Sequence, residues 1–434
     1  MLVRNSGSKP FTGLHPFPWR EKLKKRYDIG FVQARQLVMD HVSLQPSEHL
    51  PIPTACGRIV AETVYALVDS PSVRSSTKDG YAVISSDIEA ATVENPVPLT
   101  ILGHVAAGEE NRGAVSSGTA IRVLSGAPVP DGADAVLADE FTRCRENVLL
   151  AIADAPPEKN ILPSGSDVKA GQILVEKGEM VTPQLGGLVA AGGHHWIEVY
   201  RTPVVGLLAT GSEVLLPGSP LEPGKLFASN VILQQGWLTQ HHFRTVLRHA
   251  GDAHDQIREA VEQLAAETDV LITSGGAWKG DRDLMETVLE SLGWQQVFHR
   301  VRMGPGKALG MGTLHHKPVF CLPGGPTSNA MAFWMIALPA ILKMAGHRHA
   351  PFIEFQATLE RDIRGDVDWT QFVECRLVKT GSQIRLRPEK HKSRLLSIAR
   401  TQAIVLIPEG VSEIPAGSDV PCLCFTTNCF APEL

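Results

Sequence analysis

The chain has 434 residues, of which 43% are hydrophobic and 20% charged, and its formal net charge is −5 at pH 7. This length predicts several domains, and the slightly acidic balance argues against a broad basic surface for nucleic acid or anionic membranes. No apolar run approaches the roughly 20 residues that span a bilayer, and no signal-peptide core is present. We therefore expect a cytoplasmic protein with neither nucleic acid nor membrane as a partner.

The first half of the chain is rich in short β-type runs. Residues 1–27 are interpreted as an N-terminal extension whose role the sequence does not define. Apolar residues then recur at helical spacing from Phe31 to Val42, which predicts an amphipathic helix. Up to about residue 200, short runs alternate with turns of glycine, proline and aspartate, which predicts β-domains with few long helices.

The pattern changes after Pro203, where buried strands alternate with helices. Continuous apolar runs predict strands at 204–209, 243–249, 270–273 and 319–322. Helical periodicity predicts helices at 229–238, 257–265, 284–292 and 327–344, the last kinked by Pro339. This alternation indicates an α/β fold with a doubly wound parallel sheet, followed after residue 352 by a small C-terminal β-domain.

The loops after these strands have the composition of an anion site. They read ATGSE at 209–213, TSGGAWKGDRD at 273–283, GPGK at 304–307 and LPGGPTS at 322–328. Glycines allow backbone N–H groups to approach an anion, and Lys307 adds a positive charge. Glu213, Asp281 and Asp283 offer oxygen ligands for Mg²⁺. Each loop alone is equally consistent with a tight connection, but together they predict a nucleotide or phosphorylated-cofactor site.

Neither common nucleotide motif is present. Lys307 is followed by Ala308, where a P-loop requires serine or threonine, and no G-x-G-x-x-G opens the first helix of the sheet. In the β-rich half, Asp79 stands out because it precedes a glycine and an aromatic residue, although it could simply initiate a turn. The segment 125–136 is dense in proline and Asp/Gly turns, for which a rigid loop is an adequate interpretation.

Taken together, these residues closely resemble the molybdopterin molybdenumtransferases, namely the MoeA type and the E domain of gephyrin and its plant counterpart. The resemblance runs in order from about residue 28 to 425. It is carried by DGYAV (79–83), GAPVPDGADAV (126–136), SGSDVKAG (164–171), TGSEV (210–214), SNVI (229–232), SGG (274–276), GDRD (280–283), PGK (305–307), LPGGPTS (322–328) and SRLLS (393–397).

The resemblance implies four domains and a homodimer. The domains would be an elongated domain I (28–70 and 168–203), an inserted β-rich domain II (71–167), a MogA-like molybdopterin-binding domain III (204–347) and a C-terminal β-domain IV (348–434). Asp79, Ser125 and Asp167 of one subunit would complete the site on the sheet domain of the partner.

The activity it implies is insertion of molybdate or tungstate into adenylylated molybdopterin, with Mg²⁺-dependent release of AMP. Glu213, Asp252 and Asp283 would bind the metal ion, and the catalytic set would be Asp79, Asp167, Glu213, Asp283 and Lys307. Lys307, Ser328 and Ser393 would hold the oxyanion. The pterin and nucleotide would contact Ser125, Thr210, Gly211, Asn230, Ser274, Gly275, Gly276, Pro323, Gly324, Pro326, Ser328 and Ser393.

The sequence also departs from the family pattern. Ala228 replaces a frequent acid, Gly304 replaces a usual lysine, and Glu374 replaces an arginine for which Arg376 is a candidate substitute. Loss of two cations weakens an oxyanion pocket. Two alternatives therefore stay open: a molybdopterin adenylyltransferase, or an altered paralogue that carries or scaffolds the cofactor. Partners implied by the pathway are an adenylyltransferase and recipient molybdenum or tungsten enzymes.

Overall fold

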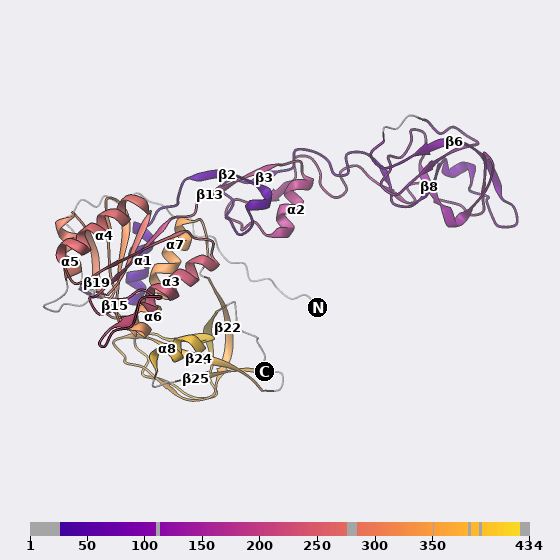
Figure 1. Cartoon of the computed structure of the whole chain (residues 1–434). Helices are drawn as coiled ribbons and strands as arrows, with labels where there is room; N and C mark the ends of the chain where they lie inside the picture. The colour runs from indigo at the N-terminus through magenta and orange to yellow at the C-terminus, as the bar shows by residue number, and fades with distance from the viewer. Residues whose placement is uncertain are drawn as a thin grey trace, which may run out of the picture.

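The computed structural model describes residues 27–109, 113–275, 284–349, 351–380, 383–389 and 393–425. The molecule is elongated: an α/β domain and the C-terminal sheet lie at one end, and a β-rich domain lies at the other (Figure 1). A small domain connects the two ends. Within the described ranges, no helix has both the length and the apolar character needed to cross a membrane.

The α/β domain is built on four parallel strands. Their order is β17 (Thr245–Ala250), β14 (Val205–Thr210), β18 (Val270–Ser274) and β21 (Lys317–Leu322). Every residue of β14 and β18 is buried, as the continuous apolar runs predict for strands covered on both faces. The predicted helices are confirmed as α3 (Ser229–Gln240), α4 (His254–Glu267) and α5 (Leu284–Ser291).

The sheet is mixed rather than purely parallel, which corrects the sequence-based expectation. Two strands that were not predicted, β19 (Gln295–Gly304) and β20 (Gly310–Leu314), extend it beyond β21 by antiparallel pairing. The intervening residues 305–309 form the connection that contains Lys307. The antiparallel pair thus places the Gly-Pro-Gly-Lys segment at one end of the sheet.

The predicted helix 327–344 is one continuous, largely buried helix that contains a π-helical turn in its middle. It consists of α6 (Pro326–Ala332), a π-helical turn (Phe333–Ala337) and α7 (Leu338–Met344). At the end of the π turn, the backbone N–H of Leu338 donates to Phe333 O, five residues earlier. Because Pro339 has no N–H to donate, the irregularity that it predicts takes the form of this π-helical turn just before it.

Residues 27–41 belong structurally to the sheet domain, although the family resemblance implies that residues 28–70 belong to the elongated domain. Strand β1 (Tyr27–Gly30) pairs in parallel with β19, and α1 (Phe31–His41) follows directly. The buried face of α1, formed by Phe31, Ala34 and Val38, shares one hydrophobic core with α7. Helical periodicity identifies an apolar face but does not identify which core that face covers.

The β-rich half forms two separate units. The elongated unit contains β2 (Ser47–Pro51), β3 (Val64–Tyr65), β12 (Ile173–Val175), α2 (Pro183–Ala191) and β13 (Trp196–Tyr200). The inserted unit is a six-stranded sheet whose order is β8 (Ala135–Ala138), β5 (Gly80–Val83), β7 (Thr119–Val123), β6 (Val97–Val105), β10 (Val148–Ala151) and β9 (Thr142–Arg145). The few short helices agree with the prediction for this half.

The C-terminal domain is joined to the α/β sheet by backbone hydrogen bonds. It contains β22 (Phe352–Leu359), β24 (Thr370–Thr380), β25 (Gln383–Pro388), α8 (Arg394–Arg400), β26 (Ala403–Ile407) and β28 (Asp419–Phe425). The start of β24 pairs in parallel with the end of β19, with Met303 opposite Thr370 and Gly304 opposite Gln371. One continuous β-sheet therefore runs through both domains.

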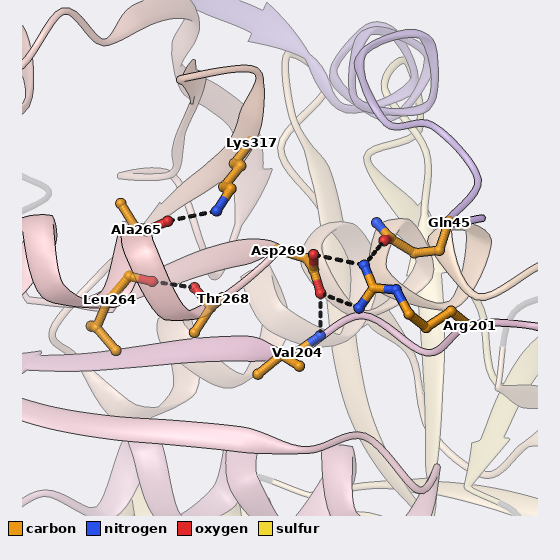
Figure 2. Close-up of polar contacts among 8 residues, drawn as sticks. All are labelled: Gln45, Arg201, Val204, Leu264, Ala265, Thr268, Asp269 and Lys317. Atoms are coloured by element: carbon orange, nitrogen blue, oxygen red, sulfur yellow. Dashed lines mark hydrogen bonds and ion pairs between the residues drawn. The ribbon is translucent and has the colours of Figure 1, made fainter. Parts of the chain in front are cut away.

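The chain crosses between the elongated unit and the sheet domain at a joint centred on one carboxylate (Figure 2). Arg201 donates from Nη1 and Nη2 to the two oxygens of Asp269, at 2.9 and 2.8 Å, and also to Gln45. Val204 N donates to the same carboxylate at 2.8 Å. Burial alone would raise the pKa of Asp269, but Arg201 and the backbone N–H of Val204 lower it. Asp269 thus ties both connecting segments to the sheet.

Candidate functional site

Parallel strands end at the same edge of a sheet, and the loops after β14, β18 and β21 accordingly meet there. Thr210 is buried at the end of β14, and its hydroxyl donates to Ser274 O at 3.3 Å. Gly275 follows with φ +106°, and a Cβ at this position would lie 2.7 Å from Thr210 Oγ1. Only glycine fits this close approach, so the Ser-Gly turn is held tightly against Thr210.

The loop after β21 is held to the same place by Asn230, in the first turn of α3. Its Nδ2 atom donates to Ser274 Oγ at 3.1 Å and to Gly324 O at 2.9 Å. Pro326 and Ser328 follow in the first turn of α6, where both are partly exposed. The sequence-predicted residues Thr210, Asn230, Ser274, Gly275 and Gly324 are therefore brought together.

Two carboxylates lie at the ends of neighbouring strands. Asp252 follows β17, and Glu213 follows β14 by way of Gly211 and Ser212. Ser212 N donates to Asp252 Oδ2 at 2.9 Å, and Asp252 N donates to Ser212 Oγ at 3.0 Å. Both carboxylates are exposed. These reciprocal bonds fix the two loops side by side and place hard oxygen atoms at the edge of the site.

Lys307 reaches this region from the loop between β19 and β20. Its Nζ atom lies 4.6 Å from the ring centre of Trp369, the residue just before β24. Val301 N donates to Lys307 O at 3.0 Å, which fixes the backbone of the loop. Trp369 was not identified from the sequence, because its contact with Lys307 depends on the β19–β24 pairing between two domains. A cation over an aromatic face is attracted to it and loses freedom.

Helix α8 supplies the last part of the site. Ser393 is its N-cap residue, and its Oγ accepts a hydrogen bond from Leu396 N at 3.2 Å. Arg394 Nη1 lies 3.8 Å from the point where a Cβ on Gly325 would stand, so this cation lies beside the Pro-Gly-Gly-Pro loop. The sequence motif 393–397 predicted a role for Ser393, but Arg394 was not among the predicted site residues.

The three departures from the family pattern have separate structural settings. Ala228 is buried, and its N–H donates to Leu215 O at 2.8 Å. Gly304 is a strand residue opposite Gln371. Glu374 accepts a hydrogen bond from Ser397 of α8. Arg376, considered as a substitute cation, has Glu389 Oε1 3.8 Å from its Nη1, which balances part of its charge.

The remaining predicted residues lie in the inserted domain. Asp79 Oδ1 accepts a hydrogen bond from Ser125 N at 2.7 Å, and Asp79 O accepts one from Asp139 N at 3.0 Å. Asp167 is exposed near the junction with the elongated unit, where its N–H donates to Ser70 O at 3.0 Å. Within one chain, this domain lies at the opposite end of the molecule from the sheet loops (Figure 1).

Some predicted residues lie outside the described structure. They are Gly276, Asp281 and Asp283, which fall in the segment 276–283. In the described part of the chain, no three histidine, cysteine, aspartate or glutamate side chains gather closely enough to hold a metal ion. Any metal site built on Glu213 and Asp252 therefore requires ligands from elsewhere.

Comparison with known proteins gives a consistent result along the chain. Residues 29–193 match the model of the MoeA N-terminal region (domain I and II), and residues 206–343 match that of a probable molybdopterin binding domain. Molybdopterin molybdenumtransferase from Staphylococcus epidermidis is 28% identical over 418 residues, covering 95% of this chain and 99% of the relative. The Bacillus subtilis protein of the same name is 29% identical over 408 residues, covering 92% and 95%.

Structural comparison agrees. A crystal structure of the molybdopterin biosynthesis MoeA protein from Pyrococcus horikoshii superposes with a TM-score of 0.81 at 29% identity, covering 92% of this chain and 99% of that one. The two matched family models occur along the chain in the same order as the observed domains, and the relatives span the chain almost completely. The chain belongs to the MoeA-type family of molybdopterin molybdenumtransferases.

Proposed function

We propose that the protein inserts molybdate or tungstate into adenylylated molybdopterin and releases AMP. As a member of its family, the chain is an enzyme of molybdenum-cofactor biosynthesis. The observation that carries the finer proposal is the single sheet edge where the Thr210, Ser274 and Gly324 loops meet. There, glycine-rich backbone suited to phosphate lies beside carboxylates on one side and cations on the other.

The donor set fits Mg²⁺. Glu213 and Asp252 offer exposed carboxylate oxygens from two adjacent strand ends, held together by the Ser212–Asp252 hydrogen bonds. Mg²⁺ is typically bound by one or two carboxylates together with substrate phosphates and water. When bound, it would neutralise charge on the phosphoanhydride as AMP departs. Asp283 is proposed as a further ligand from the sequence alone.

The cations are suited to the oxyanion. Lys307 is held over Trp369, and Arg394 lies beside the loop 322–328, so two positive charges approach the same rim from different domains. Ser328 and Ser393 add hydroxyl groups there. We propose that Arg394 compensates in part for the absence of a cation at Gly304 and Glu374, because a guanidinium binds tetrahedral oxyanions through two N–H groups.

The active form is proposed to be a homodimer. Asp79 and Ser125 cannot reach the sheet loops of their own chain in this elongated shape (Figure 1). A second copy could supply them. The elongated unit also exposes large apolar side chains, a pattern that marks interaction surfaces. They are Tyr65, Leu67, Val68, Ile173 and Trp196.

We further propose a cytoplasmic location. The chain would receive adenylylated molybdopterin from an adenylyltransferase and pass the loaded cofactor to molybdenum or tungsten enzymes.

The test is AMP release from adenylylated molybdopterin by the purified protein, with Mg²⁺ and with molybdate, tungstate or neither. Release that depends on the oxyanion is expected, and Asp283→Asn is expected to abolish it while leaving the fold intact. Undiminished release by that variant would refute its role as a metal ligand. Consumption of ATP with molybdopterin would identify an adenylyltransferase instead. Tight binding without turnover would identify a cofactor carrier.

A further inference from the structure

Two amide side chains are completely buried behind the Ser274 loop. Gln234 of α3 and Asn329 of α6 have no exposed surface, and Gln234 Nε2 donates to Asn329 Oδ1 at 2.7 Å. Buried amides lower stability unless their hydrogen-bonding groups are paired. Here Gln234 Oε1 is buried with no hydrogen-bond partner among the described residues. Because an incompletely paired amide adds little to stability, we looked for another role of this pair in the hydrogen bonds of Asn329.

The orientation of Asn329 is fixed by its neighbours. Its Nδ2 atom donates to Pro323 O at 2.8 Å and to Ser274 Oγ at 3.1 Å. A backbone carbonyl can only accept, so the side of the amide that faces Pro323 must carry the nitrogen. Asn230 is fixed by the same reasoning, because its Nδ2 faces Gly324 O as well as Ser274 Oγ. Both amides therefore donate to the same serine oxygen.

These two bonds determine how Ser274 can bind a ligand. A serine oxygen has two lone pairs and one hydrogen. Asn230 and Asn329 use both lone pairs, so the hydroxyl can act only as a donor, and no residue in the described ranges accepts its hydrogen. Asn230 has spent both amide hydrogens on Ser274 and Gly324, which leaves its Oδ1 as an acceptor. A hydroxyl donor on the nearly buried Ser274 and an amide acceptor on the partly exposed Asn230 thus stand next to each other.

We propose that Asn329 is a positioning residue that fixes Ser274 O–H beside Asn230 Oδ1, so that this donor and this acceptor recognise the lactam edge of a pterin ring. A lactam presents a carbonyl and an adjacent N–H, which complement a donor beside an acceptor. A phosphate oxygen would accept from Ser274 but would be repelled by Asn230 Oδ1. This inference rests on the proposed function and specifies which part of that substrate meets the Ser274 loop.

The experiment measures the affinity of the full-length protein for two probes, molybdopterin without the nucleotide and AMP alone. Ser274→Ala and Asn329→Ala are each expected to raise the Kd for molybdopterin about 3- to 10-fold, as loss of one neutral hydrogen bond predicts, and to leave the Kd for AMP unchanged. Thr273→Val is the matched control: it removes a neighbouring buried hydroxyl that has no hydrogen-bond partner among the described residues. It should change neither affinity.

A double-mutant cycle separates positioning from general damage. If Asn329 acts through Ser274, adding Asn329→Ala to Ser274→Ala should weaken molybdopterin binding no further. Additive losses, or a loss of AMP affinity equal to that of molybdopterin, would overturn the inference. Thermal unfolding of each variant verifies that the protein is folded, and Asn329→Asp serves if the alanine variant does not fold, because a carboxylate cannot donate to Ser274. If the wild-type protein binds neither probe, the proposed function itself fails.

Discussion

The two ends of the molecule hold their polar residues in different ways. At the sheet end, Asn230, Ser274 and Asn329 are linked to one another and to the backbone by several hydrogen bonds, and the amide of Asn329 is fully buried. At the other end, Asp79 is exposed and its carboxylate is held by one backbone N–H, that of Ser125. The first arrangement is preorganised within one chain, whereas the second is open to solvent.

This difference suggests a division of labour. Ordering side chains costs conformational entropy, and a site that is ordered during folding does not lose that entropy again when its ligand binds. The sheet end is built in this way and is suited to hold the substrate. The exposed carboxylates of the inserted domain are suited to approach a substrate that is already bound, from a second subunit.

The largest effect expected comes from mixing two inactive proteins. Asp79→Asn and Lys307→Ala should each abolish most activity, because each damages one half of every composite site. Dimers formed by co-refolding equal amounts should recover about a quarter of wild-type AMP release, since half are mixed and each mixed dimer has one intact site.

The matched control mixes Asp79→Asn with Asp167→Asn. Both changes lie on the inserted domain, so no intact site can form and no recovery is expected. Recovery in this control, or none in the first mixture, would show that the two ends do not meet across a dimer.

A smaller effect is expected at the contact between Lys307 and Trp369. Trp369→Ala removes the aromatic face 4.6 Å from the ammonium, and loss of a cation–π contact of about 0.5–2 kcal/mol predicts a KM for the oxyanion that rises several-fold. The KM of Trp369→Phe should lie between those of the wild-type protein and Trp369→Ala, because phenylalanine keeps an aromatic ring that attracts a cation more weakly. Steady-state kinetics with varied molybdate measure this, and an unchanged KM in the alanine variant would mean that Trp369 does not position Lys307.

The last effect expected is on stability rather than activity, and it depends on pH. His347 follows α7, with its ring centre 6.5 Å from that of His241. Burial, and then the charge of His241, lower the pKa of His347 from 6.5 to about 4. Because the unfolded state takes up this proton first, the folded sheet end should lose stability as the pH falls from 6.5 to 4, by on the order of 3 kcal/mol at most.

Thermal unfolding between pH 7 and 4 tests this. His347→Gln should reduce the acid-induced loss of Tm, whereas His104→Gln, an exposed change in the inserted domain, should not. An unchanged pH dependence in His347→Gln would show that another group causes the loss.

Much of the α/β domain was predictable because its strands are continuous apolar runs and its helices are amphipathic. The strands β14, β17, β18 and β21 and the helices α3, α4 and α5 follow from those patterns alone. Strands β19 and β20 were missed because they pair antiparallel and do not extend the βα alternation. The placement of β1 and α1 in the sheet domain depends on contacts over about 270 residues, which local periodicity does not encode.

The site was predictable to the extent that its loops contain glycine, lysine and carboxylates after strands. Thr210, Asn230, Ser274 and Gly324 come together as expected. Gln234 and Asn329 were missed because each lies among other polar residues of its helix, where a surface position is the ordinary interpretation of a side-chain amide. Trp369 and Arg394 were missed because their relation to the site arises only when two domains join.

That join has a mechanical consequence. The ladder from β19 to β24 connects the two domains through the strand that ends at Gly304, immediately before the loop that bears Lys307. Hydrogen-bonded strands resist sliding past one another. A rotation of the C-terminal sheet would therefore also move the loop that bears Lys307. Cutting the chain near residue 347 to isolate the sheet domain would remove the strand partner of Met303 and Gly304, while β1 would still pair with the residues just before them.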